Sequence, residues 1–199
     1  LAGQRVVAVS GGGGHNLALA AGGSVWSWGL GGYGQLGHGD RHFQLLPKKI
    51  EAFGGQRVVA VSAGGGHSLA LTADGSVWSW GDGGFGKLGH GDQQDQLLPK
   101  KIAAFASRRV GAVSGGRIHN LALPADGAVR SWGDGTFGRL GHGDQQEQFL
   151  PMKIEALAGQ RVVAVSAGTY HSLALTADGS VWSWGGGFSG QLGHGDEQD

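Results

Sequence analysis

Residues 57–102 read RVVAVSAGGGHSLALTADGSVWSWGDGGFGKLGHGDQQDQLLPKKI, and this stretch decides the fold because it occurs four times. The copies begin at Arg5, Arg57, Arg109 and Arg161, so they follow one another at a spacing of 52 residues without gaps. The fourth copy reads RVVAVSAGTYHSLALTADGSVWSWGGGFSGQLGHGDEQD. A period of this length is typical of solenoids and propellers, in which each unit buries its apolar faces only against its neighbours.

Each copy predicts four short strands, which the second copy illustrates. Residues 58–62 are a β-branched run, and residues 67–73 and 76–80 flank Asp74-Gly75, a dipeptide that favours a two-residue type I′ hairpin turn. A glycine-rich loop then leads to a fourth strand over 98–102, where Pro99 favours a sheet edge. Four short antiparallel strands per repeat are the signature of a propeller blade. The sequence therefore predicts an all-β fold, a β-propeller of four 52-residue repeats.

We expect one repeat domain over 1–199, with blades at about 5–56, 57–108, 109–160 and 161–199, the last of them truncated. Such a propeller is incomplete or open. Three arrangements remain: a fragment of a larger propeller, closure with a second copy, or an open arc capped by another protein. The first and third are favoured because both ends fall inside a repeat. Exposed blade edges would invite self-association or capping.

The composition excludes several classes of protein. The chain has 43 glycines, which suits many tight turns, and no cysteine, which excludes disulfide frameworks and cysteine metal sites. Fifteen basic residues balance fifteen acidic ones, so no nucleic-acid partner is expected. No apolar run approaches the ~20 residues of a membrane helix, so we expect no transmembrane segment. Because the first residue is Leu1 rather than methionine, a native start is not expected.

The motif HSLALTADGSVWSWG followed by GxxGxLGHGD resembles the repeat of the regulator-of-chromosome-condensation family, and the resemblance covers essentially the whole chain. It implies a propeller, typically of seven blades, whereas four repeats are present here. The family includes the plant UV-B photoreceptor, whose chromophore tryptophans lie in a G-W-R-H-T motif. The matching positions here are Gly13, Gly65, Arg117 and Thr169. None is tryptophan, so a light-sensing role is disfavoured.

The aromatic and histidine arrays predict structural rather than chemical roles. The tryptophan pairs are expected to fill the space between blades; they are Trp26/Trp28, Trp78/Trp80 and Trp182/Trp184. Histidines recur at two positions of every repeat, and a metal array is conceivable. Metal ligands must converge on one point, however, whereas residues that repeat once per blade lie on a ring. We therefore expect no metal site and no cofactor, and no nucleophile-elbow motif predicts a catalytic residue.

Departures from the repeat are the informative residues for binding. The third copy holds Arg108, Arg109, Arg117, Arg130 and Arg139, and the fourth carries Thr169-Tyr170 where the third has Arg117-Ile118. Arginine and tyrosine are enriched in protein interfaces. The candidate protein-binding residues are therefore Arg117, Ile118, Arg130, Arg139, Thr169 and Tyr170. The alternative stays open that these charges are solvated or paired with Asp126, Asp134, Asp144 or Glu147.

Together these observations predict a non-enzymatic protein–protein interaction scaffold, a structural or accessory subunit of a larger assembly, whose partner is another protein. A regulatory propeller of the guanine-nucleotide-exchange or chromatin-binding type is the alternative, and no residue set specific to exchange activity can be matched. The sequence identifies neither the partner nor the compartment.

Overall fold

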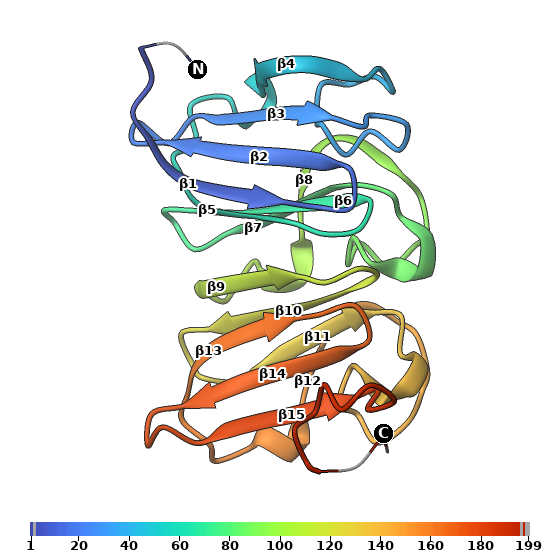
Figure 1. Cartoon of the computed structure of the whole chain (residues 1–199). Helices are drawn as coiled ribbons and strands as arrows, with labels where there is room; N and C mark the ends of the chain where they lie inside the picture. Colours follow the sequence, from blue (N-terminus) through green and yellow to red (C-terminus); the bar gives the residue numbers. More distant parts are fainter. Residues whose placement is uncertain (2, 196, 198–199) are drawn as a thin grey trace.

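The computed structural model describes residues 1, 3–195 and 197, and over these residues it contains fifteen strands in four antiparallel sheets (Figure 1). The strands of the first two sheets are β1 (Val6–Gly11), β2 (His15–Ala20), β3 (Val25–Gly29) and β4 (Gln44–Lys49), then β5 (Val58–Ala63), β6 (His67–Thr72), β7 (Val77–Gly81) and β8 (Gln96–Lys101). Those of the last two are β9 (Val110–Gly115), β10 (His119–Pro124), β11 (Arg130–Gly133) and β12 (Gln148–Lys153), then β13 (Val162–Ala167), β14 (His171–Thr176) and β15 (Val181–Gly185). Short 3-10 helices join them at η1 (Glu51–Phe53), η2 (Gly84–Gly86), η3 (Ala103–Phe105), η4 (Thr136–Gly138) and η5 (Glu155–Leu157).

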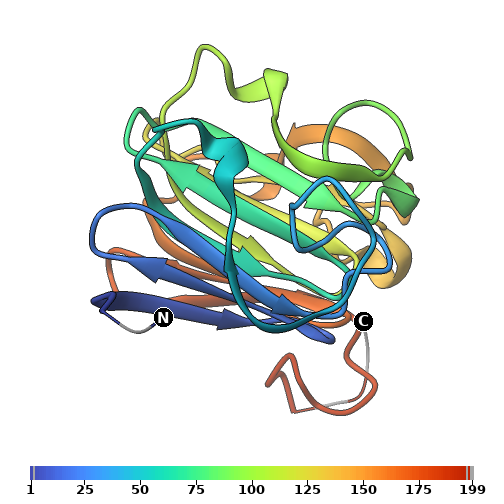
Figure 2. The ribbon, with the colours of Figure 1, turned by 90° about the horizontal axis from the view of Figure 1, so that it is seen from above.

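The sheets are propeller blades, as the sequence predicts. In each, the strands pair in chain order, and in the described part of the chain the last sheet has three strands, β13-β14-β15, instead of four. The innermost strands β1, β5, β9 and β13 contact one another in succession. The blades follow one another in a row, with the two ends of the chain at its opposite ends, and Figure 2 shows the sheets overlapping when viewed from above (Figures 1 and 2). The predicted open propeller is confirmed.

The hairpin between the second and third strands of each blade differs from the predicted turn. Of the two turn residues, only Gly75 has a positive φ, +84°. Its N–H donates to Thr72 O at 2.8 Å, and Thr72 N–H donates to Ser76 O at 3.0 Å. These bonds define a three-residue loop, a type I turn closed by a glycine in the left-handed region. The type I′ prediction is wrong because Asp74 uses its carboxylate to accept the Ser76 N–H at 3.0 Å, which fixes an Asx turn instead.

Tryptophans of the third strands hold neighbouring blades together. Trp80 is fully buried, meets the Phe53 ring edge-on at 5.7 Å and donates its indole N–H to Gln35 O of the preceding blade at 2.8 Å. Trp132 and Trp184 donate in the same way to Lys87 O and Arg139 O, both at 2.9 Å. Burial of so large a ring is the main apolar contribution, and the hydrogen bond satisfies its only polar atom. The tryptophans thus serve as links between blades.

Two ends of every blade must be distinguished. The end that carries segments 12–14, 64–66, 116–118 and 168–170 is called the loop face, and it also carries the glycine-rich loops that follow the third strands. The end with the hairpins 21–24, 73–76, 125–128 and 177–180 is called the hairpin face. Antiparallel strands alternate between these faces, so residues at equivalent repeat positions emerge on the same face of every blade.

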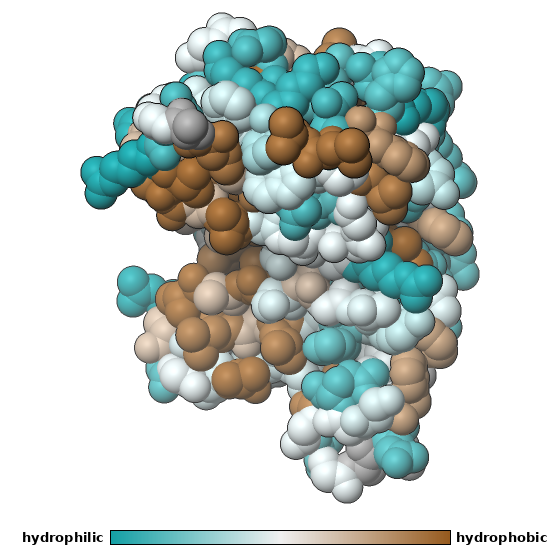
Figure 3. Space-filling view, turned by 45° about the horizontal axis from the view of Figure 1, so that its top comes forward, coloured by the Kyte–Doolittle hydropathy of each residue, from teal (hydrophilic) through white to brown (hydrophobic). Residues whose placement is uncertain are grey.

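The first and last blades expose apolar side chains that equivalent residues bury elsewhere. Leu45 is 93% exposed. Its counterpart in the second blade, Leu97, packs against the first blade, because a Cβ built on Gly34 would lie 2.5 Å from the Leu97 side chain. At the other end of the row, Val181 is 69% exposed, whereas Val25, Val77 and Val129 at the same repeat position are at most 1% exposed. Figure 3 shows apolar surface gathered on one side around a hollow between the N-terminal and C-terminal halves. Both outer blades therefore present unpaired halves of a blade-to-blade interface.

Candidate functional site

The loop face brings the four predicted loops together around a cavity of about 630 Å³. Backbone hydrogen bonds join each loop to the next, from Gly13 N to Gly64 O at 3.0 Å and from Gly65 N to Gly116 O at 3.1 Å. The series continues from Arg117 N to Gly168 O at 3.2 Å. The cavity is lined mostly by glycine backbone, while its side chains come from the third and fourth blades and from Tyr33, Asp82 and Lys87.

Arg117 and Tyr170 are at the centre of an aromatic and cationic cluster. Arg117 is exposed, donates from Nη1 to Tyr170 Oη at 2.9 Å, and lies 6.0 Å from the centre of that ring. The Tyr170 ring contacts Phe137 at 5.8 Å and Phe188 at 5.3 Å between ring centres. A guanidinium over an aromatic ring is an interaction of about 0.5–2 kcal/mol, depending on exposure. The cluster is therefore held in place before any partner arrives.

Arg139 supports this cluster from below. Its side chain is 1% exposed and pairs with Asp134 at 3.0 Å. Its guanidinium lies 5.3 Å from the Tyr170 ring centre, and its Nη1 donates to Thr169 O at 3.2 Å. Burial lowers the pKa of Arg139 below its ordinary value, an effect that the carboxylate of Asp134 opposes. Because it is covered, Arg139 positions Tyr170 and Thr169 rather than contacting a partner.

Further aromatic residues extend the cluster along the loop face, and the sequence reasoning missed them. Phe85 is 43% exposed, and Tyr33 and Phe188 are also exposed. Phe85 and Phe137 both have φ of 60°, a left-handed conformation that bulky residues rarely adopt. The available signal was an aromatic residue inside each glycine-rich loop after the third strand. Strained backbone of this kind is concentrated at functional positions.

The structure divides the predicted binding residues into two groups. Arg117, Ile118, Thr169 and Tyr170 lie together on the loop face, with Arg139 beneath them. Arg130 lies apart from them, because β11 begins there and the residue adjoins the hairpin face. Of the predicted carboxylate partners, Asp134 pairs with Arg139, and Asp126 lies 3.9 Å from Arg108. The sequence alone could not separate Arg130 from the others.

The histidines before the second strands join blades. Ser68 donates its hydroxyl to Gln35 O at 2.9 Å, so the 2.8 Å contact with His15 has the His15 Nε2–H as its donor. His67 donates likewise to Asn120 Oδ1 at 2.6 Å, and His119 donates to Ser172 Oγ at 2.9 Å. Each ring then keeps a buried, unprotonated Nδ1 that has no hydrogen-bond partner within the described residues. Between them, the described residues bring no three metal-binding side chains together.

Burial makes these rings hard to protonate. It lowers the pKa of His15 and of His67 from 6.5 to about 4, and that of His119 to about 3. A proton added at Nδ1 would place a charge where no acceptor lies, so the neutral ring is the form that the blade interface accommodates.

Comparison with protein families matches residues 1–199 to the model described as the RCC1-like domain. Among curated proteins, the chain is 43% identical over 197 residues to the E3 ubiquitin-protein ligase HERC2 of Homo sapiens, covering 98% of this chain and 4% of that protein. It is 41% identical over 197 residues to the Ultraviolet-B receptor UVR8 of Arabidopsis thaliana, covering 98% of this chain and 45% of the receptor. The chain thus spans less than half of either relative.

Solved structures resemble the whole arc. The structure of Prp20p from Saccharomyces cerevisiae, described with its binding properties to Gsp1p and histones, is 29% identical with a TM-score of 0.83, and the match covers 98% of this chain and 47% of that one. Yeast RCC1 (Prp20) bound by Kap60 gives a TM-score of 0.85 at 28% identity, covering 100% of this chain and 48% of that one. The described residues include no helix long and apolar enough to cross a bilayer.

Proposed function

The chain belongs to the RCC1-like domain family, and from this premise we propose that residues 1–199 act as a single, non-enzymatic repeat domain that binds a protein partner through the loop face. The observation that carries the proposal is the cluster of Arg117, Tyr170, Phe137 and Phe188. Aromatic residues and arginine that are fixed before binding lose little conformational freedom in a complex, which is typical of interface anchors.

The charge of the cluster indicates what the partner presents. Among the interactions described, the Arg117 guanidinium donates only to the neutral hydroxyl of Tyr170, so its remaining donors are available to a carboxylate. Lys87 and Arg139 add buried positive charge beneath the same face, each opposite an aspartate. We expect a partner surface with an acidic side chain for Arg117 and an apolar group for Tyr170 and Phe188.

Regulation of a nucleotide-binding protein is the alternative function. It is favoured by the likeness to Prp20p, which has binding properties to Gsp1p and histones. The likeness to HERC2 does not favour a ligase activity for this chain, because the match covers 4% of that protein. Nucleotide release from purified Gsp1p, followed by fluorescence, separates the two functions. Unchanged release agrees with a scaffold, and acceleration by this chain would establish the alternative.

The scaffold proposal is tested by replacing Arg117 and Tyr170 together with alanine. Proteins captured from a cell extract by the wild-type chain are quantified and compared with those captured by the double variant. The control is Arg57→Ala, an exposed arginine on the hairpin face. Loss of two anchors should reduce capture at least tenfold, since such truncations each cost about 2 kcal/mol or more. Equal capture by the wild type and the double variant would exclude the loop face.

A further inference from the structure

The third hairpin does not pack against the next blade as the first two do. Val58 N donates to Gly23 O at 3.2 Å and Val110 N donates to Gly75 O at 3.0 Å, so these two hairpins touch the following blade. At the third interface Val162 N donates instead to Gln160 O at 3.1 Å. A Cβ built on Gly127 would meet nothing within 4 Å, whereas one on Gly75 would meet Arg109 at 2.9 Å.

Pro124 explains this difference. In the other blades the residue at this position donates its N–H across the hairpin: Ala20 to Ser24 O, Thr72 to Ser76 O and Thr176 to Ser180 O, at 2.9–3.0 Å. Proline has no N–H, so the bond cannot form. Accordingly β11 begins at Arg130 and has four residues, whereas the third strand of each other blade has five. The hairpin of blade three is therefore displaced from blade four.

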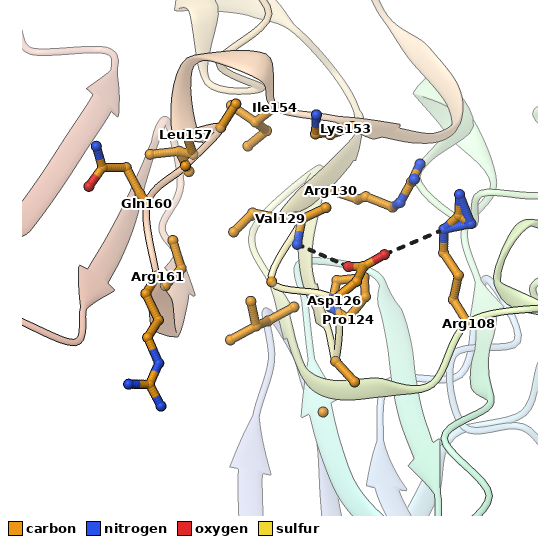
Figure 4. A pocket seen from close by; sticks show the side chains of 18 residues that line it. Arg108, Pro124, Asp126, Val129, Arg130, Lys153, Ile154, Leu157, Gln160 and Arg161 are labelled. Atoms are coloured by element: carbon orange, nitrogen blue, oxygen red, sulfur yellow. Dashed lines mark hydrogen bonds and ion pairs between the residues drawn. The ribbon is translucent and has the colours of Figure 1, made fainter.

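This displacement opens a pocket of about 890 Å³ between blades three and four on the hairpin face (Figure 4). That volume is within the range of pockets that bind ligands. Apolar side chains line its inner wall, namely Leu123, Val129, Ile154, Leu157 and Val162. Arg108, Arg130 and Lys153 are the basic residues near its edge, and in Figure 4 Arg161 extends away from Val129 and Pro124.

The two arginines of the pocket are incompletely paired, whereas Lys153 donates to Glu155 at 2.7 Å. Arg130 donates from Nη1 to Pro151 O at 3.3 Å, but its buried Nε has no hydrogen-bond partner within the described chain. Burial and the neighbouring charge of Arg108 lower the pKa of Arg130, an effect that Asp126 and Glu155 oppose. Arg108 in turn lies 3.9 Å from Asp126, too far for a hydrogen bond. Arg108 and Arg130 are thus near enough for their charges to repel, and the carboxylates of Asp126 and Glu155 offset that charge only in part.

Both arginines are departures from the repeat, as is the proline. Arg130 stands where the other copies have Trp26, Trp78 and Trp182, and Arg108 stands where they have glutamine. Substitutions at three separate repeat positions therefore meet at one place. The loss of the hairpin bond makes the space, and the arginines give its edge a positive charge.

We propose that this pocket binds an acidic peptide segment of a protein partner, with an apolar side chain against Val129, Ile154 and Leu157 and a carboxylate between Arg130 and Arg108. A free inorganic anion would satisfy the guanidinium groups but leave the apolar wall empty. A carboxylate accepts from a guanidinium in two parallel hydrogen bonds, which the terminal Nη groups of Arg130 and Arg108 would supply. The pocket is on the face opposite the Arg117–Tyr170 cluster, so it is a second site and does not depend on the first.

The test uses the whole chain and a fluorescein-labelled peptide that has one leucine with two glutamates on each side, followed by fluorescence anisotropy. Two control peptides replace the leucine with glycine or the glutamates with glutamine. Arg130→Gln should weaken binding at least tenfold, because a charged hydrogen bond of this kind is lost. Arg57→Gln, at the same face but at another blade interface, should bind as the wild type does.

A closing variant, Pro124→Thr with Ala128→Ser, restores the residues of the second hairpin and should abolish binding while raising the melting temperature. The Arg117→Ala, Tyr170→Ala variant should bind the peptide normally, which separates this site from the loop face. The proposal is overturned if the wild type does not bind at about 1 mM peptide, if Arg130→Gln binds equally well, or if the glycine peptide binds as tightly as the leucine peptide. The last result would indicate attraction between charges alone.

Discussion

Acid should destabilise this protein mainly through the three histidines that join its blades, and His90, whose pKa burial lowers to about 4, adds to the effect. In the folded state the pKa of His15 and His67 is about 4 and that of His119 about 3, against 6.5 in an exposed histidine. Above pH 6.5 the rings are neutral in both states and contribute their full stability. As the pH falls from 6.5 towards 4, the unfolded chain binds protons that the folded chain does not. The free energy of unfolding must then decrease.

The size of the effect follows from the pKa shifts. A shift of 2.5 units corresponds to about 3 kcal/mol when the transition is complete, and to about 2 kcal/mol at pH 5. Three such histidines lower the free energy of unfolding by roughly 6 kcal/mol at pH 5, a large share of the 5–15 kcal/mol of an ordinary domain. Urea denaturation followed by tryptophan fluorescence at pH 8, 7, 6 and 5 measures this decrease.

His67→Gln identifies the source of the decrease. Glutamine carries an amide near the position of Nε2, so it can still donate to Asn120, but it does not titrate. The pH dependence of this variant should be weaker than that of the wild type by about a quarter or less, because burial lowers the pKa of at least three other histidines, His15, His119 and His90, by a similar amount. Arg57→Gln changes an exposed side chain, keeps every histidine and should leave the slope unchanged. Identical slopes for the two variants, or a wild type equally stable at pH 8 and pH 5, would refute the reasoning.

Two other substitutions test the packing between blades and beneath the loop face. Gly64→Ala should destabilise the fold by about 2 kcal/mol or more, since a Cβ there would collide with the His67 ring and lie 2.6 Å from Gly116 O. The control is Gly22→Ala, where a Cβ meets nothing within 4 Å. Equal urea midpoints for the two variants would contradict the close contact at Gly64. Asp134→Asn should lower the free energy of unfolding by about 3 kcal/mol or more, because it leaves the buried Arg139 without its counter-charge. The control is Glu51→Gln, in an exposed pair with Lys49, which should change the free energy of unfolding by less than about 1 kcal/mol. Similar losses in both variants would show that the buried Arg139 pair contributes no more than an exposed pair.

The repeat predicted the architecture well because a blade is a local arrangement. Strands, turns and glycines recur every 52 residues, so the period alone indicates how many sheets there are and in what order their strands pair. The strand predicted over 98–102 is observed at Gln96–Lys101, so it begins two residues and ends one residue earlier than predicted. The hairpin type was wrong because a side-chain acceptor, Asp74, decides it rather than the glycine alone.

Binding residues were predicted less well than the fold, since they depend on which departures from the repeat meet in space. Arg117 and Tyr170 are 53 residues apart, one position more than the period, yet they touch, because each blade packs on the next. Arg139 looked like an exposed anchor and is buried, because Asp134 lies opposite it. The effect of Pro124 could have been inferred from its missing N–H only with the register of the hairpin in hand.

The carbonyl oxygens of Gln35, Lys87 and Arg139 have a consequence for how such proteins diversify. Each accepts from a tryptophan of the next blade and also from Ser68, Asn120 or Ser172 at 2.7–2.9 Å. Because the link between blades uses main-chain atoms, it places no demand on the side chain of the same residue. That side chain varies from glutamine to lysine to arginine, and the residue five positions earlier varies with it, from Leu30 to Asp82 to Asp134. The residues at these two positions can therefore change together in one blade without altering the hydrogen bonds between blades. The charge beneath the loop face can then differ from blade to blade while the assembly of the blades stays the same.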